Sequence, residues 1–422
     1  MHATKSIEQL RTLESELSEQ YQSIKQRGLN LDLTRGKPSN EQLVLSVALL
    51  GNISAAAGSD VSLRNYGGLL GIPAARELFA PVLGVSHDET LVGGNSSLTL
   101  MYFAAHFAMH LGVDGPDSAW NNEGKVKFLA PVPGYDRHFS VCETLGIELV
   151  TVAMLEDGPD MDEVERLLTA DPLIKGIWCV PRFSNPTGHV YSDRVVQRFA
   201  GLAKIAGRNF RIFWDNAYAL HTISDDAPEL ANLMAACRTQ GTQDSVYLFG
   251  STSKITFAGA GVSFAGMSKR NLANFSAHLG MTQIGPDKIN QLRHVEFLKD
   301  QETLHALMQR HAALLKPRFD AVLTGLEDGL GETGMGEWTQ PQGGYFISFN
   351  TLPGLAGEVV RMAAEAGVKL TPAGATYPYG KDPQDNNIRI APSVPTVTEI
   401  TAATDVFVTC VKLATVRQQL AG

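Results

Sequence analysis

The chain has 422 residues, of which 44% are hydrophobic and 19% are charged, so it can bury a large core and is too apolar to be disordered. Its formal net charge of −9 argues against the phosphate backbone of a nucleic acid as the main partner, because that contact needs clustered lysines and arginines. The longest apolar stretch, Leu98 to Val113, is shorter than a membrane span, so we expect no membrane association either.

The cysteines and histidines give no sign of a metal site. The four cysteines lie far apart and form no CxxC pair, which is typical of small buried residues in a reducing compartment. His106 and His110 are four residues apart, but the intervening glutamate of a zinc hydrolase motif is absent. Residues 1–28 are polar and acidic and do not resemble a signal peptide. We therefore expect a cytoplasmic protein without a metal.

The N-terminal segment predicts one helix followed by an extended arm. Apolar residues recur every three or four positions from Ile7 to Ile24, with glutamates between them, and Gly28 ends this pattern. Residues 29–39 then read as an extended arm with a turn at Gly36. A single acidic helix is too small for a DNA-binding head.

Short apolar strands alternate with helical stretches from about residue 45, up to a long helical region around residues 286–326. This alternation predicts a mainly parallel sheet that helices cover on both faces. The candidate strands are Val126–Ala130, Glu148–Ala153, Gly176–Val180, Phe210–Trp214, Val246–Phe249 and Val262–Gly266, and the candidate helices between them include Asp162–Ala170 and Ser192–Ala206.

Later strands indicate a second, smaller α+β unit, at Gly343–Asn350 and Ile388–Ala391. We expect this unit to combine the N-terminal arm with the last hundred residues. The predicted organisation is therefore an N-terminal helix and arm over residues 1–44 as part of the small domain, a large domain over 45–320 and a small C-terminal domain over 321–422.

Three polar motifs follow three successive predicted strands. They are Ser184–Gly188 (SNPTG), Asp215–Tyr218 (DNAY) and Ser251–Lys254 (STSK), and a lone Arg389 lies in the last predicted strand. Taken singly, these are a turn, a helix cap, a solvated lysine and an ion-pair arginine. Because ligands bind beyond the carboxyl ends of parallel strands, the shared order favours one site at that edge of the sheet.

This order of motifs resembles the class I aminotransferases of the pyridoxal-phosphate (PLP) fold-type I group, over nearly the whole chain from about Leu31. The segments LDLTRGKPS, RNYGGLLGIPAARELF, GGNSSLTL, PVPGYDRHF and SKITFAGAGVSF resemble, more narrowly, an atypical bacterial subgroup of aspartate aminotransferases. The resemblance implies a large PLP-binding domain with a mainly parallel seven-stranded sheet between helices, and a smaller α+β domain. It also implies a homodimer with shared active sites.

The resemblance assigns the catalytic and ring-binding residues. Lys254 is expected to form the internal Schiff base with PLP and then to move the Cα proton. Asp215 is expected to pair with the pyridine nitrogen and keep it protonated. Tyr218 and Asn185 are expected to hydrogen-bond the phenolic oxygen of the cofactor, and Tyr135 to stack on its ring.

The phosphate of the cofactor is expected to bind at the start of the apolar helix that follows residues 94–97. Backbone N–H groups and the positive end of the helix dipole favour an anion there. The residues assigned to the phosphate are Asn95, Ser96, Ser97, Ser251 and Ser253, together with Tyr66 from the neighbouring subunit. Most relatives carry an arginine eight residues after the lysine, where this chain has Val262, so the cation that replaces it is an open question.

The substrate is expected to lie between the arm and the late arginine. Arg389 would bind the α-carboxylate, because its planar guanidinium offers two parallel donors. Gly36 would let the arm approach the substrate closely, and Asn185 would also contact it. The cation for a distal carboxylate stays open among Arg35, Lys37, Arg137, His138 and Arg182.

The leading hypothesis is therefore transamination between L-aspartate and 2-oxoglutarate by a ping-pong mechanism. The alternatives are an aminotransferase for alanine or aromatic amino acids, and a PLP lyase on the same scaffold, since a fold alone does not fix a reaction. A non-enzymatic alternative is an aminotransferase-like ligand sensor.

Overall fold

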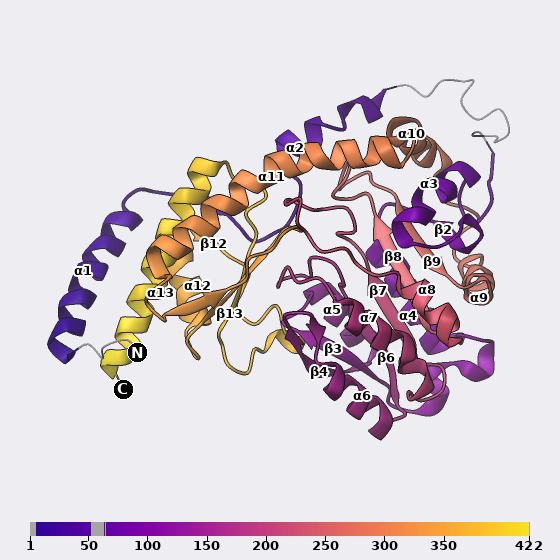
Figure 1. The fold of residues 1–422 in the computed structure, drawn as a ribbon, viewed down its shortest axis with the longest axis horizontal. Helices are drawn as coiled ribbons and strands as arrows, with labels where there is room; N and C mark the ends of the chain where they lie inside the picture. Colours follow the sequence, from indigo (N-terminus) through magenta and orange to yellow (C-terminus); the bar gives the residue numbers. More distant parts are fainter. Residues whose placement is uncertain (1–5, 52–62, 64, 422) are drawn as a thin grey trace.

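The computed structural model describes residues 6–51, 63 and 65–421, which form an α/β fold with two groups of elements (Figure 1). In the larger group, the described residues form an eight-stranded sheet with the order β2-β9-β8-β7-β6-β3-β4-β5. Its strands are β2 (Thr90–Val92), β3 (Lys127–Val132), β4 (Glu148–Leu155), β5 (Gly158–Pro159), β6 (Ile174–Cys179), β7 (Arg211–Asp215), β8 (Val246–Ser251) and β9 (Ser263–Met267).

The central strands of this sheet run in one direction. Strands β4, β3, β6, β7 and β8 are parallel, β9 is antiparallel to β8, and β2 is antiparallel to β9. Every residue of β6 and β7 is buried, as expected for strands covered on both faces. The predicted α/β class with a mainly parallel sheet is confirmed. The expected seven strands are one too few, because the two-residue β5 pairs with the edge strand β4.

Helices cover both faces of the large sheet. Ile212 and Trp214 of β7 belong to one buried apolar cluster and Phe213 belongs to another, so successive side chains point to opposite faces. Helices α3, α6, α7, α8 and α10 contribute to the first cluster, and α4, α5 and α9 contribute to the second. The bounds are α3 (Pro73–Leu83), α4 (Ser97–His110), α5 (Asp136–Leu145), α6 (Met161–Ala170), α7 (Asp193–Gly201), α8 (Leu233–Gln240), α9 (Lys269–Leu279) and α10 (Lys288–Leu298).

The smaller group joins the two ends of the chain. Its antiparallel sheet has the order β10-β11-β13, and the short strand β1 pairs in parallel with β12. Leu17 of the N-terminal helix, Phe349 and Val411 share one buried apolar cluster, so both ends of the chain build the same core. The elements are α1 (Ile7–Lys25), β1 (Leu31–Asp32), β10 (Gly336–Trp338), β11 (Ile347–Thr351), α12 (Ala356–Glu365), β12 (Val368–Lys369), β13 (Asn387–Ile390) and α13 (Val397–Ala421).

A long helix, α11 (Gln301–Leu330), connects the two groups (Figure 1). Its Leu304 and Leu307 pack in the core of the large sheet, whereas Phe319 and Leu326 pack in the core of the smaller group. The expected boundary at residue 320 therefore lies inside a continuous helix. The short helix α2 (Asn40–Val44) packs against α11, directly after the arm.

The helices and the cysteines bear on membrane insertion and on disulfide formation. No helix in the described part of the chain is long and apolar enough to cross a membrane. Cys142, Cys179, Cys237 and Cys410 are buried and form no disulfide.

Candidate functional site

A cavity of about 800 Å³ lies where the carboxyl ends of β6, β7 and β8 face β13 and the N-terminal arm. Eleven of the residues predicted for the site line it. They are Gly36, Ser96, Ser97, Tyr135, Asn185, Asp215, Tyr218, Ser251, Ser253, Lys254 and Arg389. Segments separated by more than 300 residues in the sequence thus meet in one place.

Asp215 is buried at the end of β7, and only one of its two carboxylate oxygens has a protein partner. His138 Nε2 lies 3.0 Å from Asp215 Oδ2, and the ring of His138 stacks on Trp178 with centroids 4.4 Å apart. Within the described chain, Asp215 Oδ1 is buried without a hydrogen-bond partner. A buried acceptor in this state is costly unless a ligand donates to it. The carboxylate can therefore hold one N–H group or cation in the cavity.

Lys254 follows β8 and lies half-buried beside Tyr218. Its Nζ lies 5.0 Å from the centre of the Tyr218 ring. Burial lowers the pKa of the Lys254 ammonium, and the Asp215 carboxylate partly offsets this effect. A lysine with a lowered pKa has a larger fraction of the neutral, nucleophilic amine. Burial also raises the pKa of Tyr218 well above its ordinary value, so its hydroxyl keeps its proton.

Arg389 of β13 is buried and points across the cavity toward the large sheet. Its Nη1 donates to Asn185 Oδ1 at 3.1 Å and to Asp136 Oδ1 at 3.3 Å, and its guanidinium lies 4.8 Å from the centre of the Phe346 ring. These contacts hold the guanidinium in one orientation. A carboxylate in the cavity can therefore meet an arginine that is already positioned.

Hydroxyl and backbone donors gather at the start of α4. The helix begins at Ser97 with Ser96 as its N-cap residue, and the Ser96 side chain makes no capping hydrogen bond. Ser251 and Ser253 line the same cavity, and Ser253 Oγ donates to the carbonyl oxygen of Asn95 at 3.4 Å. First-turn N–H groups of a helix and hydroxyls together can bind an anion. Val262 is buried and pairs with Thr252 through backbone and side-chain hydrogen bonds, so it offers no charge.

Gly36 allows the arm to pack tightly against Tyr345 and Phe346, which precede β11. A Cβ atom at Gly36 would lie 2.5 Å from Phe346 Cζ and 2.9 Å from Tyr345 Cβ. Contacts this short do not occur for real Cβ atoms, so only glycine fits without a shift of the arm. The arm thereby brings Arg35 and Lys37 to the cavity.

The five candidate cations for a distal carboxylate separate into two groups. Arg35, Lys37 and Arg137 line the cavity. His138 does not, because it is buried against Asp215. Arg182 does not line it either, since its guanidinium donates to the carbonyl oxygens of Ala219 and Pro228.

Two predicted phosphate-binding residues are absent from the lining of the cavity. Asn95 contributes only its carbonyl oxygen, which accepts a 3.4 Å hydrogen bond from Ser253 Oγ. Tyr66 is 78% exposed and lines a separate hollow with Ile289. Within one chain, Tyr66 is therefore not part of the site.

Several lining residues carry no motif by which the sequence could reveal them. Phe346 packs under Arg389, and Thr371 Oγ1 accepts from Arg389 Nε at 3.3 Å. Thr34 and Asp136 also line the cavity. The contact between His138 and Asp215 was missed as well, and the position of His138, three residues after Tyr135 in the first turn of α5, was its one weak signal.

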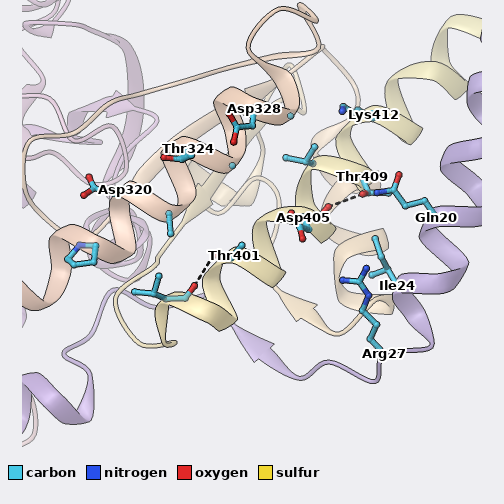
Figure 2. Close-up of a pocket in the computed structure, with 16 residues that line it drawn as sticks. Gln20, Ile24, Arg27, Asp320, Thr324, Asp328, Thr401, Asp405, Thr409 and Lys412 are labelled. Carbon is cyan, nitrogen blue, oxygen red and sulfur yellow. Dashed lines mark hydrogen bonds between the residues drawn. The ribbon is translucent and has the colours of Figure 1, made fainter.

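A second cavity of about 720 Å³ lies between α1, α11 and α13 (Figure 2). Its charged lining residues are Asp320 and Asp328 of α11, Asp405 and Lys412 of α13, and Arg27, which follows the end of α1. No residue predicted for the site lines it. The chemistry is therefore concentrated in the first cavity.

The family model described as aspartate amino-transferase matches residues 5–422. The chain belongs to the aspartate aminotransferase family. It is 44% identical over 412 residues to an aspartate aminotransferase of Corynebacterium glutamicum, which covers 96% of this chain and 94% of the relative. This confirms the family predicted from the motifs, and the assignment of the chain as an aminotransferase. The family implies PLP as the cofactor.

Solved structures agree with this family over the whole chain. An aspartate transaminase structure from Corynebacterium glutamicum is 43% identical, has a TM-score of 0.92 and covers 99% of this chain and 100% of its own. An alpha-aminoadipate aminotransferase from Thermus thermophilus is 21% identical, with a TM-score of 0.71 and coverage of 94% and 95%. The second comparison shows a common fold alone, and this is the expected fold-type I architecture.

Proposed function

We propose that this protein transfers the amino group of L-aspartate to 2-oxoglutarate, with PLP bound at Lys254 in the cavity between the arm and the large sheet. The observation that carries the proposal is the buried, unpartnered Asp215 Oδ1 in the same cavity as Lys254 and Arg389. The 44% identity to a named aspartate aminotransferase supports the choice of substrate. The two half-reactions follow one another in a ping-pong mechanism.

The residues of the cavity fit PLP. When bound, PLP supplies an electron sink for the negative charge that develops at the substrate Cα. Asp215 Oδ1 would accept the N–H of the protonated ring nitrogen, while His138 holds the carboxylate in place through Oδ2. Tyr135 offers its ring for stacking. Tyr218 and the amide nitrogen of Asn185 offer donors to the phenolic oxygen, since Asn185 Oδ1 is already used by Arg389.

Lys254 has two tasks in this proposal. Its amine would hold the cofactor, and the neutral amine would serve as the base for the proton of the substrate Cα. The lowered pKa of Lys254 favours both steps, because only the neutral amine is a nucleophile and a base.

Neutral donors hold the phosphate in place of the missing arginine at Val262. We assign this to the first-turn N–H groups of α4 with the hydroxyls of Ser96, Ser97, Ser251 and Ser253. We retain Asn95 only as a backbone contributor to this loop.

Arg389 binds the α-carboxylate of the substrate, and the cations of the arm bind its distal carboxylate. Arg35 and Lys37 flank Gly36 and line the same cavity as Arg389. No side chain in the described ranges forms an ion pair with Arg35 or Lys37, unlike most exposed arginines of this protein. Both are therefore available to a dicarboxylic substrate.

Replacing both arm cations, in Arg35→Met/Lys37→Met, is expected to lower kcat/KM for L-aspartate by about tenfold to a hundredfold, the effect of losing a charge-assisted hydrogen bond. The same enzyme should keep its kcat/KM for L-alanine within about twofold, because alanine has no distal carboxylate. The matched control is Lys369→Met on β12, which lies outside the cavity lining. An equal loss for both amino acids would show that the arm cations do not select the substrate.

We also propose a homodimer in which Tyr66 reaches the phosphate site of the partner. Exposed apolar side chains gather around the segment that carries Tyr66, because the short 3-10 helix Val47–Leu50 packs beside α10 and Ile289 of α10 lines the hollow with Tyr66. These exposed residues are Val44, Val47, Leu50, Tyr66, Met281, Ile284 and Ile289. Apolar patches of this kind mark protein interfaces.

The dimer has a direct test in a hybrid of two inactive or weakened chains. Lys254→Ala removes the catalytic amine, and Tyr66→Phe is expected to weaken PLP binding by about tenfold through one lost hydrogen bond. Mixing and refolding the two variants should restore one intact site per hybrid dimer, with Lys254 from one chain and Tyr66 from the other. A monomer in solution, or unchanged PLP affinity in Tyr66→Phe, would contradict the shared site.

The remaining parts of the proposal concern organisation and location. We propose the division into residues 1–44 and 321–422 as the small domain and 45–320 as the large PLP-binding domain, with α11 shared between them. Four buried cysteines without a disulfide support a reducing, cytoplasmic location. Release of ammonia or carbon dioxide from the amino acid without consumption of a keto acid would instead support a PLP lyase.

A further inference from the structure

A chain of hydrogen bonds connects the N-terminal arm to the turn that carries Lys254. Ser39 caps α2, two residues after Lys37, and its backbone N–H donates to Gln42 Oε1 at 3.0 Å. Gln42 Nε2 lies 3.0 Å from His311 Nδ1, and His311 Nε2 lies 2.9 Å from the carbonyl oxygen of Ile255. Ile255 is the residue after Lys254.

The donor and acceptor of each of these hydrogen bonds follow from the two backbone groups at the ends of the series, the N–H of Ser39 and the carbonyl of Ile255. The carbonyl oxygen of Ile255 can only accept, so His311 Nε2 carries a proton and donates. The backbone N–H of Ser39 can only donate, so the oxygen of Gln42 faces Ser39 and its amide nitrogen faces His311. His311 Nδ1 is then the acceptor. The arrangement is satisfied with His311 neutral, and burial favours that form by lowering the pKa of His311 to about 4.

The same series of hydrogen bonds also reaches the segment that carries Phe346, which lines the cavity. Gln42 Nε2 also donates to the hydroxyl of Tyr345 at 3.0 Å, and Tyr345 precedes Phe346, which packs under Arg389. A second histidine, His221, lies 3.3 Å from the carbonyl oxygen of Lys254 through its Nε2. Buried histidines therefore contact the carbonyl groups of both Lys254 and Ile255. One of them, His311, is connected to the arm through Gln42.

We propose that Gln42 and His311 are positioning residues, which hold the arm and the Lys254 turn at a fixed separation. The cations of the arm and the amine of Lys254 can then act on the same substrate molecule. Both side chains are buried, at 0% and 1% exposure, and neither lines the cavity. They act through Lys254 and the arm and not through contact with the substrate. The inference rests on the proposed role of Lys254 as the lysine that binds PLP.

Gln42→Met tests this inference, with Gln291→Met as the matched control. Gln291 is also a glutamine with 0% exposure whose amide bonds backbone groups, but it joins Ile72 and Val92 instead of the Lys254 turn. Two readouts are compared in the PLP-loaded enzymes: the pH midpoint of the visible band of the lysine-bound cofactor, and KM for L-aspartate. Thermal unfolding of each variant measures the general loss of stability.

Gln42→Met is expected to move the spectral midpoint by about half a pH unit or more and to raise KM by on the order of tenfold, because both ends of the chain are released. Gln291→Met should lower the unfolding temperature to a similar degree and leave both readouts unchanged. Gln42→Glu keeps the acceptor for Ser39 and replaces the amide donor by an oxygen that faces the acceptor nitrogen of His311, so both readouts should shift again while the cap of α2 is kept.

Unchanged midpoint and KM in Gln42→Met and Gln42→Glu would overturn the inference and leave these residues a structural role only. Equal shifts in Gln291→Met would overturn it as well, since any buried change would then produce them. The wild-type enzyme separates this result from a failure of the proposed function. If wild type shows no band of lysine-bound PLP, the proposed function itself is contradicted, whatever the variants show.

Discussion

Replacing Lys254 with alanine is expected to abolish transamination. The variant keeps the cavity and its donors but loses both the amine that attaches the cofactor and the base that takes the Cα proton. Tyr218, whose ring is 5.0 Å from the lysine nitrogen, cannot replace it, because its raised pKa keeps the hydroxyl protonated. The measurement is the rate of oxaloacetate formation from L-aspartate and 2-oxoglutarate, with PLP in excess.

The control for this change is Lys269→Ala. Lys269 is the next lysine along the chain and forms an exposed ion pair with Asp88, so its loss should alter neither turnover nor stability by much. Small amines added to Lys254→Ala should restore part of the activity, because they supply the missing base. Near-wild-type turnover in Lys254→Ala without added amine would refute the assignment of this lysine.

Asp215→Asn is expected to lower kcat by on the order of a thousandfold or more, which corresponds to about 4 kcal/mol of transition-state stabilisation. The carboxylate that keeps the ring nitrogen protonated is replaced by a neutral amide of the same shape, while the contact with His138 can be kept through either amide atom. The large effect follows from burial, because Asp215 Oδ1 is shielded from water and has no other partner in the described chain.

The cofactor content of Asp215→Asn must be matched to that of wild type before rates are compared. The bound cofactor is measured by absorbance, and kcat is then expressed per loaded site. This separates the chemical step from weaker binding of PLP. A loss of tenfold or less per loaded site would mean that the ring nitrogen has another partner than Asp215.

The sequence was most informative where a short polar motif directly follows a buried strand. The motifs that contain Asn185, Asp215 and Lys254 each follow a buried strand, and the parallel arrangement of those strands brings them together. Arg389 could be placed only through the family resemblance, since 135 residues separate it from Lys254 and no periodicity relates the two. Strand β2 was missed because three buried residues are too few for a recognisable pattern.

The parts that the sequence did not reveal depend on tertiary contacts. His138 reads as a possible substrate cation from its position after Tyr135, but its partner is determined by how α5 packs on β7. Gln42 and His311 lie 269 residues apart, and neither belongs to a motif in the sequence that singles it out. A long helical region was expected around residues 286–326, but the fact that α11 belongs to both cores was not apparent, because its apolar pattern continues without a break across the expected domain boundary.

The most direct test of the central claim is the visible absorption spectrum of the purified protein with PLP, recorded before and after addition of L-aspartate or L-alanine without any keto acid. We predict a visible band of lysine-bound cofactor that L-aspartate removes much faster than L-alanine does. A band that L-aspartate leaves unchanged would contradict the proposed substrate, and the absence of any such band with PLP in excess would contradict the proposed site itself.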